Sequence, residues 1–154
     1  MLTLPPLKNQ KVAFLAVGNP LRGDDAFGPL VYGRLKQRAS ADFLPLDGGE
    51  LPESQISPIK RFNPAVLIMA DAALMPGEPA GALKLLNGQD IINPALSTHT
   101  LPLSVMLKFL KQDLPNLKII FIAAKAESAD FAAAPSKAIE AAAQAAALAV
   151  LAAL

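Results

Sequence analysis

Three short, mostly apolar runs constrain the fold of this 154-residue chain more than any other feature. They are Lys11–Val17, Ala65–Ala70 and Leu117–Ala123. Each is shorter than a typical helix, and continuous hydrophobicity over so few residues is typical of a strand that is buried on both faces. Such strands belong to parallel sheets that are covered by helices.

Weaker patterns predict the elements between these runs. Further strands are expected at Phe43–Leu46 and Ala82–Leu86. Helices are expected from Asp24 or Asp25 to Arg38, around Glu53–Arg61 with an interruption at Pro58, from Pro102 to about Asp113, and from Pro135 to Leu154. Alternation of strands and helices predicts an α/β sandwich with a largely parallel sheet. We find no linker and no repeat, so residues 1–154 are expected to form a single domain.

Composition excludes several kinds of function. The chain has no cysteine, which rules out disulfides, thiolate nucleophiles, thiolate zinc sites and iron–sulfur ligation. Its 14 basic and 13 acidic residues are scattered and aromatic residues make up only 5%, so nucleic-acid binding is not expected. The apolar stretch Ala141–Leu154 is shorter than the roughly 20 residues that span a membrane. With no signal peptide visible in Met1–Gln10, we expect a cytoplasmic protein without a membrane span.

Acidic residues follow three of the predicted strands. Asp24 and Asp25 come after the first strand, Asp47 after the second and Asp71 after the third, and His99, the only histidine, precedes a predicted helix. Loops at the carboxyl ends of strands build the ligand crevice of open α/β sheets. Carboxylates with one imidazole suit a borderline transition metal such as nickel or zinc, and three ligands leave open coordination positions.

Each of these residues also has a structural interpretation. Asp24 or Asp25 is a candidate helix N-cap, although only one of them can act as the cap. Asp71 could accept hydrogen bonds from backbone amides in a turn, and Asp47, which precedes two glycines, is typical of turn chemistry. A lone histidine such as His99 is usually not a metal ligand.

Signatures of several other enzyme classes are missing. The sequence contains no HExxH, GxSxG or GxxxxGK[ST] pattern. The loop Gly18–Gly23 lacks the second glycine of a dinucleotide-binding turn, and two carboxylates follow it where phosphates would bind. An α/β nucleotide or phosphate binder is therefore a weak alternative.

Four segments together resemble the hydrogenase maturation peptidases, which remove a C-terminal extension from the large subunit of [NiFe] hydrogenases. Gly18–Pro29 is similar to the family pattern G-N-x-L-x-x-D-[DE]-x-x-G. Asp47–Gly49 and Ala70–Ala72 follow, and Ser97–Leu103 is similar to the pattern [ST]-x-H-x-[LM]. The four segments occur in the order of the family, and the first is the most specific.

The resemblance implies a three-layer α/β/α sandwich around a mostly parallel, twisted, five-stranded sheet. It implies that Asp25, Asp71 and His99 contact a nickel ion that the substrate brings, bound to the cysteines of the immature large subunit. Asp25 and Asp71 are then also the candidate catalytic residues, either of which could act as general base. The implied partner is the large-subunit precursor, and a monomer is expected.

The chain departs from the family in two places. Ala26 stands where the family often has glycine, and Lys125–Glu127 replaces a G-[IV]-x-P or Q-P element after the last strand. The second change leaves an alternative open, namely a non-catalytic, metal-dependent binding module that recognises the immature subunit without cutting it.

A protein substrate also requires an apolar patch on the rim of the crevice. The candidates for it in the sequence are Leu21, Phe27, Leu101 and Leu103, each of which could instead belong to the core.

Overall fold

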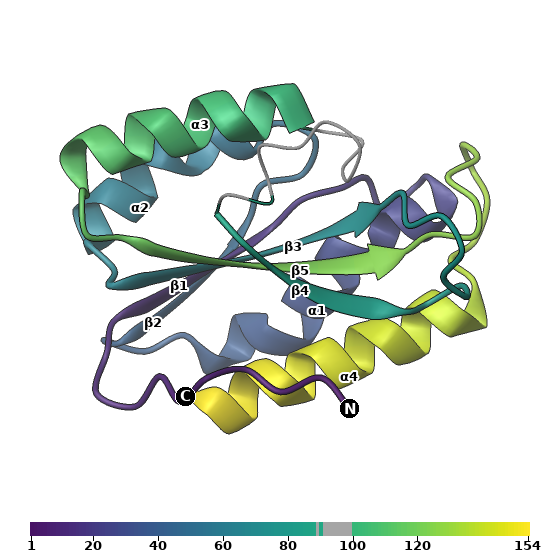
Figure 1. Ribbon diagram of the computed structural model, residues 1–154, viewed down its shortest axis with the longest axis horizontal. Helices are drawn as coiled ribbons and strands as arrows, with labels where there is room; N and C mark the ends of the chain where they lie inside the picture. Colours follow the sequence, from purple (N-terminus) through teal and green to yellow (C-terminus); the bar gives the residue numbers. More distant parts are fainter. Residues whose placement is uncertain (89, 91–99) are drawn as a thin grey trace.

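The computed structural model describes residues 1–88, 90 and 100–154, and its centre is a twisted five-stranded sheet (Figure 1). The strands are β1 (Val12–Ala16), β2 (Phe43–Asp47), β3 (Val66–Ala73), β4 (Leu83–Asn87) and β5 (Lys118–Lys125). They lie in the order β2-β1-β3-β5-β4. All neighbours pair in parallel except β4, which runs antiparallel to β5.

Helices cover both faces of the sheet, as the three-layer prediction requires (Figure 1). Helices α1 (Phe27–Leu35) and α4 (Lys137–Ala153) lie on one face, and α2 (Ile56–Phe62) and α3 (Thr100–Asp113) lie on the other. Successive side chains of each strand point alternately toward the two helical layers. In β1, Phe14 packs in the core beneath α1 and α4, whereas Leu15 packs in the core beneath α2 and α3.

The first predicted helix is divided into three parts. Its residues form a 3-10 turn, η1 (Gly23–Ala26), then α1, then a second 3-10 turn, η2 (Lys36–Arg38). Neither aspartate caps this helix, because both lie inside η1 and neither η1 nor α1 has a side-chain cap hydrogen bond. The prediction of an N-cap at Asp24 or Asp25 is therefore wrong.

Proline positions account for two smaller differences. Pro58 does not interrupt the second helix, because it lies in the first turn of α2, where a backbone N–H has no partner within the helix. A third 3-10 turn, η3 (Pro52–Gln55), precedes α2. The last helix begins at Lys137 rather than at Pro135, since the Ser136 hydroxyl oxygen accepts the Ile139 N–H at 3.2 Å and caps α4.

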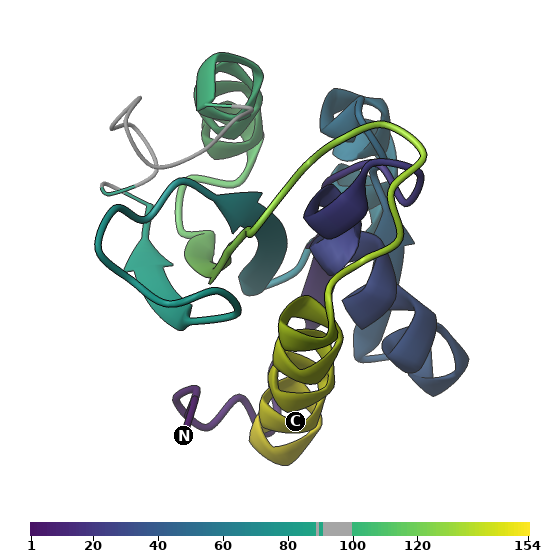
Figure 2. The same cartoon turned by 90° about the vertical axis from the view of Figure 1, so that its right-hand side faces the viewer.

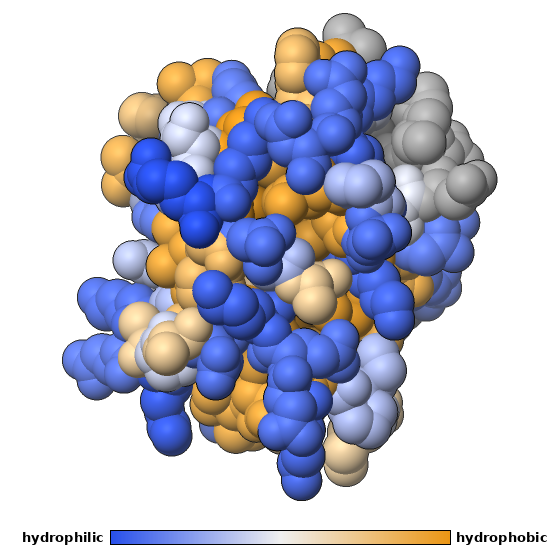
Figure 3. All heavy atoms as spheres, turned by 90° about the vertical axis from the view of Figure 1, so that its left-hand side faces the viewer, coloured by the Kyte–Doolittle hydropathy of each residue, from blue (hydrophilic) through white to orange (hydrophobic). Residues whose placement is uncertain are grey.

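The surface at the amino ends of the parallel strands carries many hydrophilic side chains with smaller apolar areas between them (Figure 3). In the parts of the chain that the structure describes, no helix combines the length and hydrophobicity needed to cross a bilayer.

Candidate functional site

The carboxyl ends of β1, β2 and β3 lie on the same side of the molecule, which we call the carboxyl edge of the sheet (Figure 2). The predicted acidic residues lie at or next to these strand ends. In the register of the sheet, Ala16 at the end of β1 lies opposite Asp47 of β2 and Ala70 of β3. Asp71 is the next residue of β3, and the turn that follows β1 leads directly into η1. The parallel topology therefore explains why residues far apart in the sequence meet here.

Gly28 allows the start of α1 to lie directly against the sheet. A Cβ atom at this position would be 2.2 Å from the carbonyl oxygen of Val17 and 2.6 Å from that of Ala70. Both neighbours are backbone atoms that cannot easily move, since Ala70 lies in β3 and the Val17 N–H donates to the Ala70 carbonyl. This contact fixes the η1 turn, which carries Asp25, beside the segment of β3 that leads into Asp71.

Asp25 is buried, with 7% of its surface exposed, and its carboxylate faces the preceding loop. Its Oδ2 accepts the Asn19 N–H at 2.8 Å. Gly18 makes this turn possible, because it adopts a φ of +130° and a Cβ there would be 2.0 Å from the Asp25 carbonyl oxygen. Among the described residues, the bond to Asn19 is the one hydrogen bond that the Asp25 carboxylate makes.

Asp71 is fully buried and lies inside β3, not in a turn after it. The strand continues to Ala73 because β5 pairs with it over the same length, with Asp71 opposite Ala123. The interpretation of Asp71 as a turn residue is therefore wrong. Charged side chains are seldom fully buried, because burial of a carboxylate costs desolvation free energy, so Asp71 stays a candidate for a functional role.

Asp24 differs from its neighbour because its carboxylate is saturated. Its Oδ1 accepts the Ser136 N–H at 2.7 Å, and its Oδ2 accepts the Glu127 N–H at 2.7 Å and the Ser136 hydroxyl at 2.9 Å. The residue is only 1% exposed. Three charge-assisted hydrogen bonds satisfy this buried carboxylate, which gives Asp24 a structural role rather than a ligand role.

Asp47 has the turn role that its two following glycines predict. Its Oδ1 accepts the Gly49 N–H at 3.1 Å, and the side chain is exposed.

His99, the third predicted ligand, lies outside the described residues, as do Ser97 and Thr98 of the same segment. Across residues 1–88, 90 and 100–154 no three or more His, Cys, Asp or Glu side chains are grouped so that they could hold a metal ion. The two described members of the predicted ligand set, Asp25 and Asp71, supply carboxylates at the same edge. Such a donor pair fits a divalent cation that brings other ligands of its own.

The apolar rim differs from the prediction. Leu21 is 62% exposed, as expected, but Phe27 and Leu103 have no exposed surface and belong to the core. They are buried because α1 and α3 turn those positions toward the sheet. The Leu101 side chain lies outside the described part. Sequence reasoning missed Phe131, which is 69% exposed between β5 and α4; a single aromatic residue in an alanine-rich connection was the available signal.

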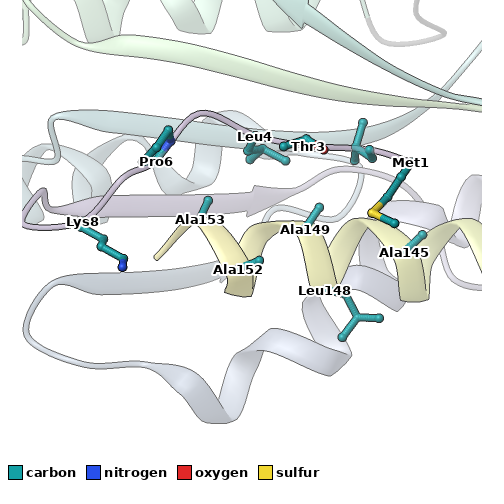
Figure 4. Close-up of a pocket in the computed structure, with 11 residues that line it drawn as sticks. Met1, Thr3, Leu4, Pro6, Lys8, Ala145, Leu148, Ala149, Ala152 and Ala153 are labelled. Atoms are coloured by element: carbon teal, nitrogen blue, oxygen red, sulfur yellow. The ribbon is translucent and has the colours of Figure 1, made fainter.

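A groove of about 700 Å³ lies away from this edge, between the N-terminal segment and α4 (Figure 4). Apolar side chains such as Leu4 and Leu148 line it, and Lys8 is the one charged residue among the lining residues. The groove is lined mostly by apolar side chains and contains none of the buried carboxylates, so the carboxyl edge of the sheet is the better candidate site.

Comparison with known proteins agrees with this architecture. The family model for hydrogenase maturation proteases matches residues 30–153. A Methanocaldococcus jannaschii protein named for the same activity is 34% identical over 139 residues, covering 84% of this chain and 81% of the relative. The hydrogenase 3 maturation protease of Escherichia coli K12 is 32% identical over 109 residues, covering 70% of this chain and 68% of that protein.

Solved structures give the same result. A [NiFe] hydrogenase maturation protease from Thermococcus kodakarensis superposes with a TM-score of 0.81 and 32% identity, over 96% of this chain and 93% of that one. The α/β fold with a mostly parallel five-stranded sheet is therefore confirmed, as is the expectation of a peptide-bond hydrolase. The chain belongs to the hydrogenase maturation protease family.

Proposed function

We propose that this chain is the endopeptidase that removes the C-terminal extension of a [NiFe] hydrogenase large-subunit precursor after nickel has been inserted. Asp25, Asp71 and His99 recognise the nickel ion, which arrives with the precursor and is part of the substrate. The observation that carries the proposal is the burial of Asp25 and Asp71 at one edge of the sheet, beside the close contact of Gly28 with Ala70.

The two carboxylates and one imidazole of this ligand set support a site that distinguishes a metal-loaded precursor from an empty one. Two carboxylates and one imidazole leave coordination positions for the thiolates of the precursor. A chain that supplies only part of a coordination shell binds the metal-loaded precursor more tightly than the empty one. Docking of the nickel then places the neighbouring peptide bond at the edge of the sheet, where proximity favours its hydrolysis.

Hydrolysis itself requires a base and a water molecule. The water oxygen attacks the carbonyl carbon of the scissile bond while Asp25 or Asp71 accepts the water proton. The C–N bond then breaks and the same proton passes to the leaving nitrogen. The products are a new C-terminal carboxylate on the large subunit and a released peptide with a free amino group.

A processing assay tests this proposal. Purified protein is mixed with the large-subunit precursor, either loaded with nickel or free of it, and the products are weighed by mass spectrometry. We expect a C-terminal peptide to be released only from the nickel-loaded precursor. Tight binding without release would instead support the non-catalytic binding module, and equal release from both precursors would contradict recognition of nickel.

A further inference from the structure

The connection between β5 and α4, residues 126–136, arches beside η1 at the carboxyl edge of the sheet (Figure 2). We refer to it as the strap. Its backbone is bonded to the turn that carries Asp25: the Gly23 N–H donates to the Ala133 carbonyl at 3.0 Å, and the Asp24 N–H donates to the Ser128 carbonyl at 2.7 Å. A bond of 2.7 Å from the Ala132 N–H to the Leu21 carbonyl completes the contact.

The buried carboxylate of Asp24 fastens both ends of the strap. It accepts the Glu127 N–H where the strap leaves β5, and both the N–H and the hydroxyl of Ser136 where the strap enters α4. The fit at Gly23 is equally close, since a Cβ there would be 2.6 Å from the Ser128 carbonyl oxygen and the residue has a φ of +53°. These hydrogen bonds therefore hold the backbone of the strap against η1 and the loop that precedes it.

Two large apolar side chains are exposed where the strap and the turn meet. Leu21 is 62% exposed and Phe131 is 69% exposed, and the residue after Phe131 donates its N–H to Leu21. Their exposure does not come from a loose backbone, because the bonds described above hold both segments. Apolar side chains held in water next to a catalytic edge are typical of a protein-binding surface.

We propose that the strap is a wall of the substrate-binding site, on which Phe131 and Leu21 bind apolar side chains of the hydrogenase precursor, and that Asp24 positions this wall. The inference rests on the proposed function for the identity of the partner. The precursor is the occupant that fits, because Leu21 lies in the loop that leads into η1, four residues before Asp25, so a polypeptide whose nickel reaches Asp25 passes beside Leu21 and Phe131. Asp24 is thereby a positioning residue, while its neighbour Asp25 contacts the substrate.

Steady-state processing of nickel-loaded precursor tests the wall directly. We expect Phe131→Ala to raise KM roughly tenfold with kcat little changed, because a contact made equally to ground state and transition state affects binding alone. Phe109→Ala is the matched control, since Phe109 is 51% exposed but lies on α3. An unchanged KM for Phe131→Ala, or an equal rise for Phe109→Ala, would overturn the role of the wall.

Variants of Ser136 and Asp24 test the positioning role. Ser136→Ala removes one hydrogen bond to Asp24, and Asp24→Asn leaves one acceptor oxygen where the carboxylate uses two. Both variants should raise KM when they are assayed well below their melting temperatures. Ser136→Thr keeps the hydroxyl, so its KM should stay near the wild-type value. A melting temperature that falls while KM stays at the wild-type value would show that Asp24 only stabilises the fold.

The same variants separate this inference from the proposed function. If the wild-type protein binds the precursor without cutting it, the endopeptidase proposal fails, and the dissociation constants of the same variants replace KM as the readout. A weaker affinity for Phe131→Ala would then still support the wall. A wild-type protein that neither binds nor cuts the precursor would overturn both.

Discussion

Asp24 and Asp25 are consecutive residues of one 3-10 turn, yet their carboxylates bind different parts of the molecule. The Asp24 carboxylate accepts three hydrogen bonds from Glu127 and Ser136, more than 100 positions along the chain, whereas that of Asp25 accepts the Asn19 N–H at 2.8 Å. The acidic pair therefore divides two tasks: Asp24 holds the strap, and Asp25 lies in the candidate site.

Asp25→Asn should abolish processing and leave the fold intact. The amide oxygen of asparagine can still accept the Asn19 N–H, so we expect the melting temperature to fall by less than about 3 °C. Asparagine is a poorer metal ligand and cannot accept a proton, so the processing rate should fall about 100-fold or more. Mass spectrometry of the products and thermal denaturation check both results.

Asp47→Asn is the matched control for that change. Asp47 lies at the same edge of the sheet, but its exposed carboxylate only accepts the Gly49 N–H, which an amide oxygen can do as well. Processing should stay at the wild-type rate. If both variants process the precursor equally well, Asp25 has no special role.

His99→Ala should also slow processing. Loss of a residue that orients a metal ligand typically lowers activity by about 10- to 100-fold. Loss of the ligand itself should cost at least as much, so we expect the processing rate to fall about tenfold or more. The melting temperature should change little if the side chain serves the substrate nickel. A large drop in melting temperature would instead identify His99 as a buried structural residue.

Gly28→Ala should destabilise the protein strongly. The new Cβ would collide with the Val17 and Ala70 carbonyl oxygens, so α1 must move away from the sheet, at a cost of about 2–3 kcal/mol. A change of that size lowers the melting temperature by roughly 5–10 °C. Gly33→Ala, on the same helix with no atom within 4 Å of the new Cβ, should raise stability by about 0.5–1 kcal/mol. Equal effects of the two changes would contradict the close contact.

Leu103→Ala tests the assignment of Leu103 to the core. The side chain has no exposed surface, so its truncation should cost about 2–5 kcal/mol in free energy of unfolding. Val105→Ala on the same helix removes a side chain that is 46% exposed and should change stability by about 0.5 kcal/mol or less. Denaturant titration measures both values. A small effect at Leu103 would contradict its assignment to the core and make it again a candidate for the apolar patch on the rim of the crevice.

The buried strands were the most predictable part of the fold. Continuous apolar runs such as Ala65–Ala70 identify a strand whatever its neighbours are, because both faces are buried. The direction of β4 and the extension of β3 to Ala73 were not predictable, since both depend on pairing with β5. Pairing partners that are distant in sequence leave no local pattern.

The candidate site was predictable in its residue types but not in its contacts. Residues that follow strands meet at one end of any parallel sheet, which made Asp24, Asp25, Asp47 and Asp71 candidates, and the family resemblance singled out Asp25 and Asp71. The role of Asp24 could not be predicted, because its partners Glu127 and Ser136 belong to a connection at the other end of the chain. The sequence likewise could not show that Leu103 is buried while Leu21 is exposed, because that difference depends on tertiary packing.

X-ray absorption at the nickel edge tests the central claim most directly. The spectrum of nickel-loaded precursor is recorded alone and then frozen within seconds of mixing with the protein, with Asp25→Asn and His99→Ala measured in parallel. We predict that the wild-type protein adds oxygen and nitrogen ligands to the thiolate-bound nickel, that Asp25→Asn alters the oxygen contribution, and that His99→Ala removes the imidazole contribution. An unchanged nickel spectrum in a complex that demonstrably forms would contradict recognition of the metal by these residues.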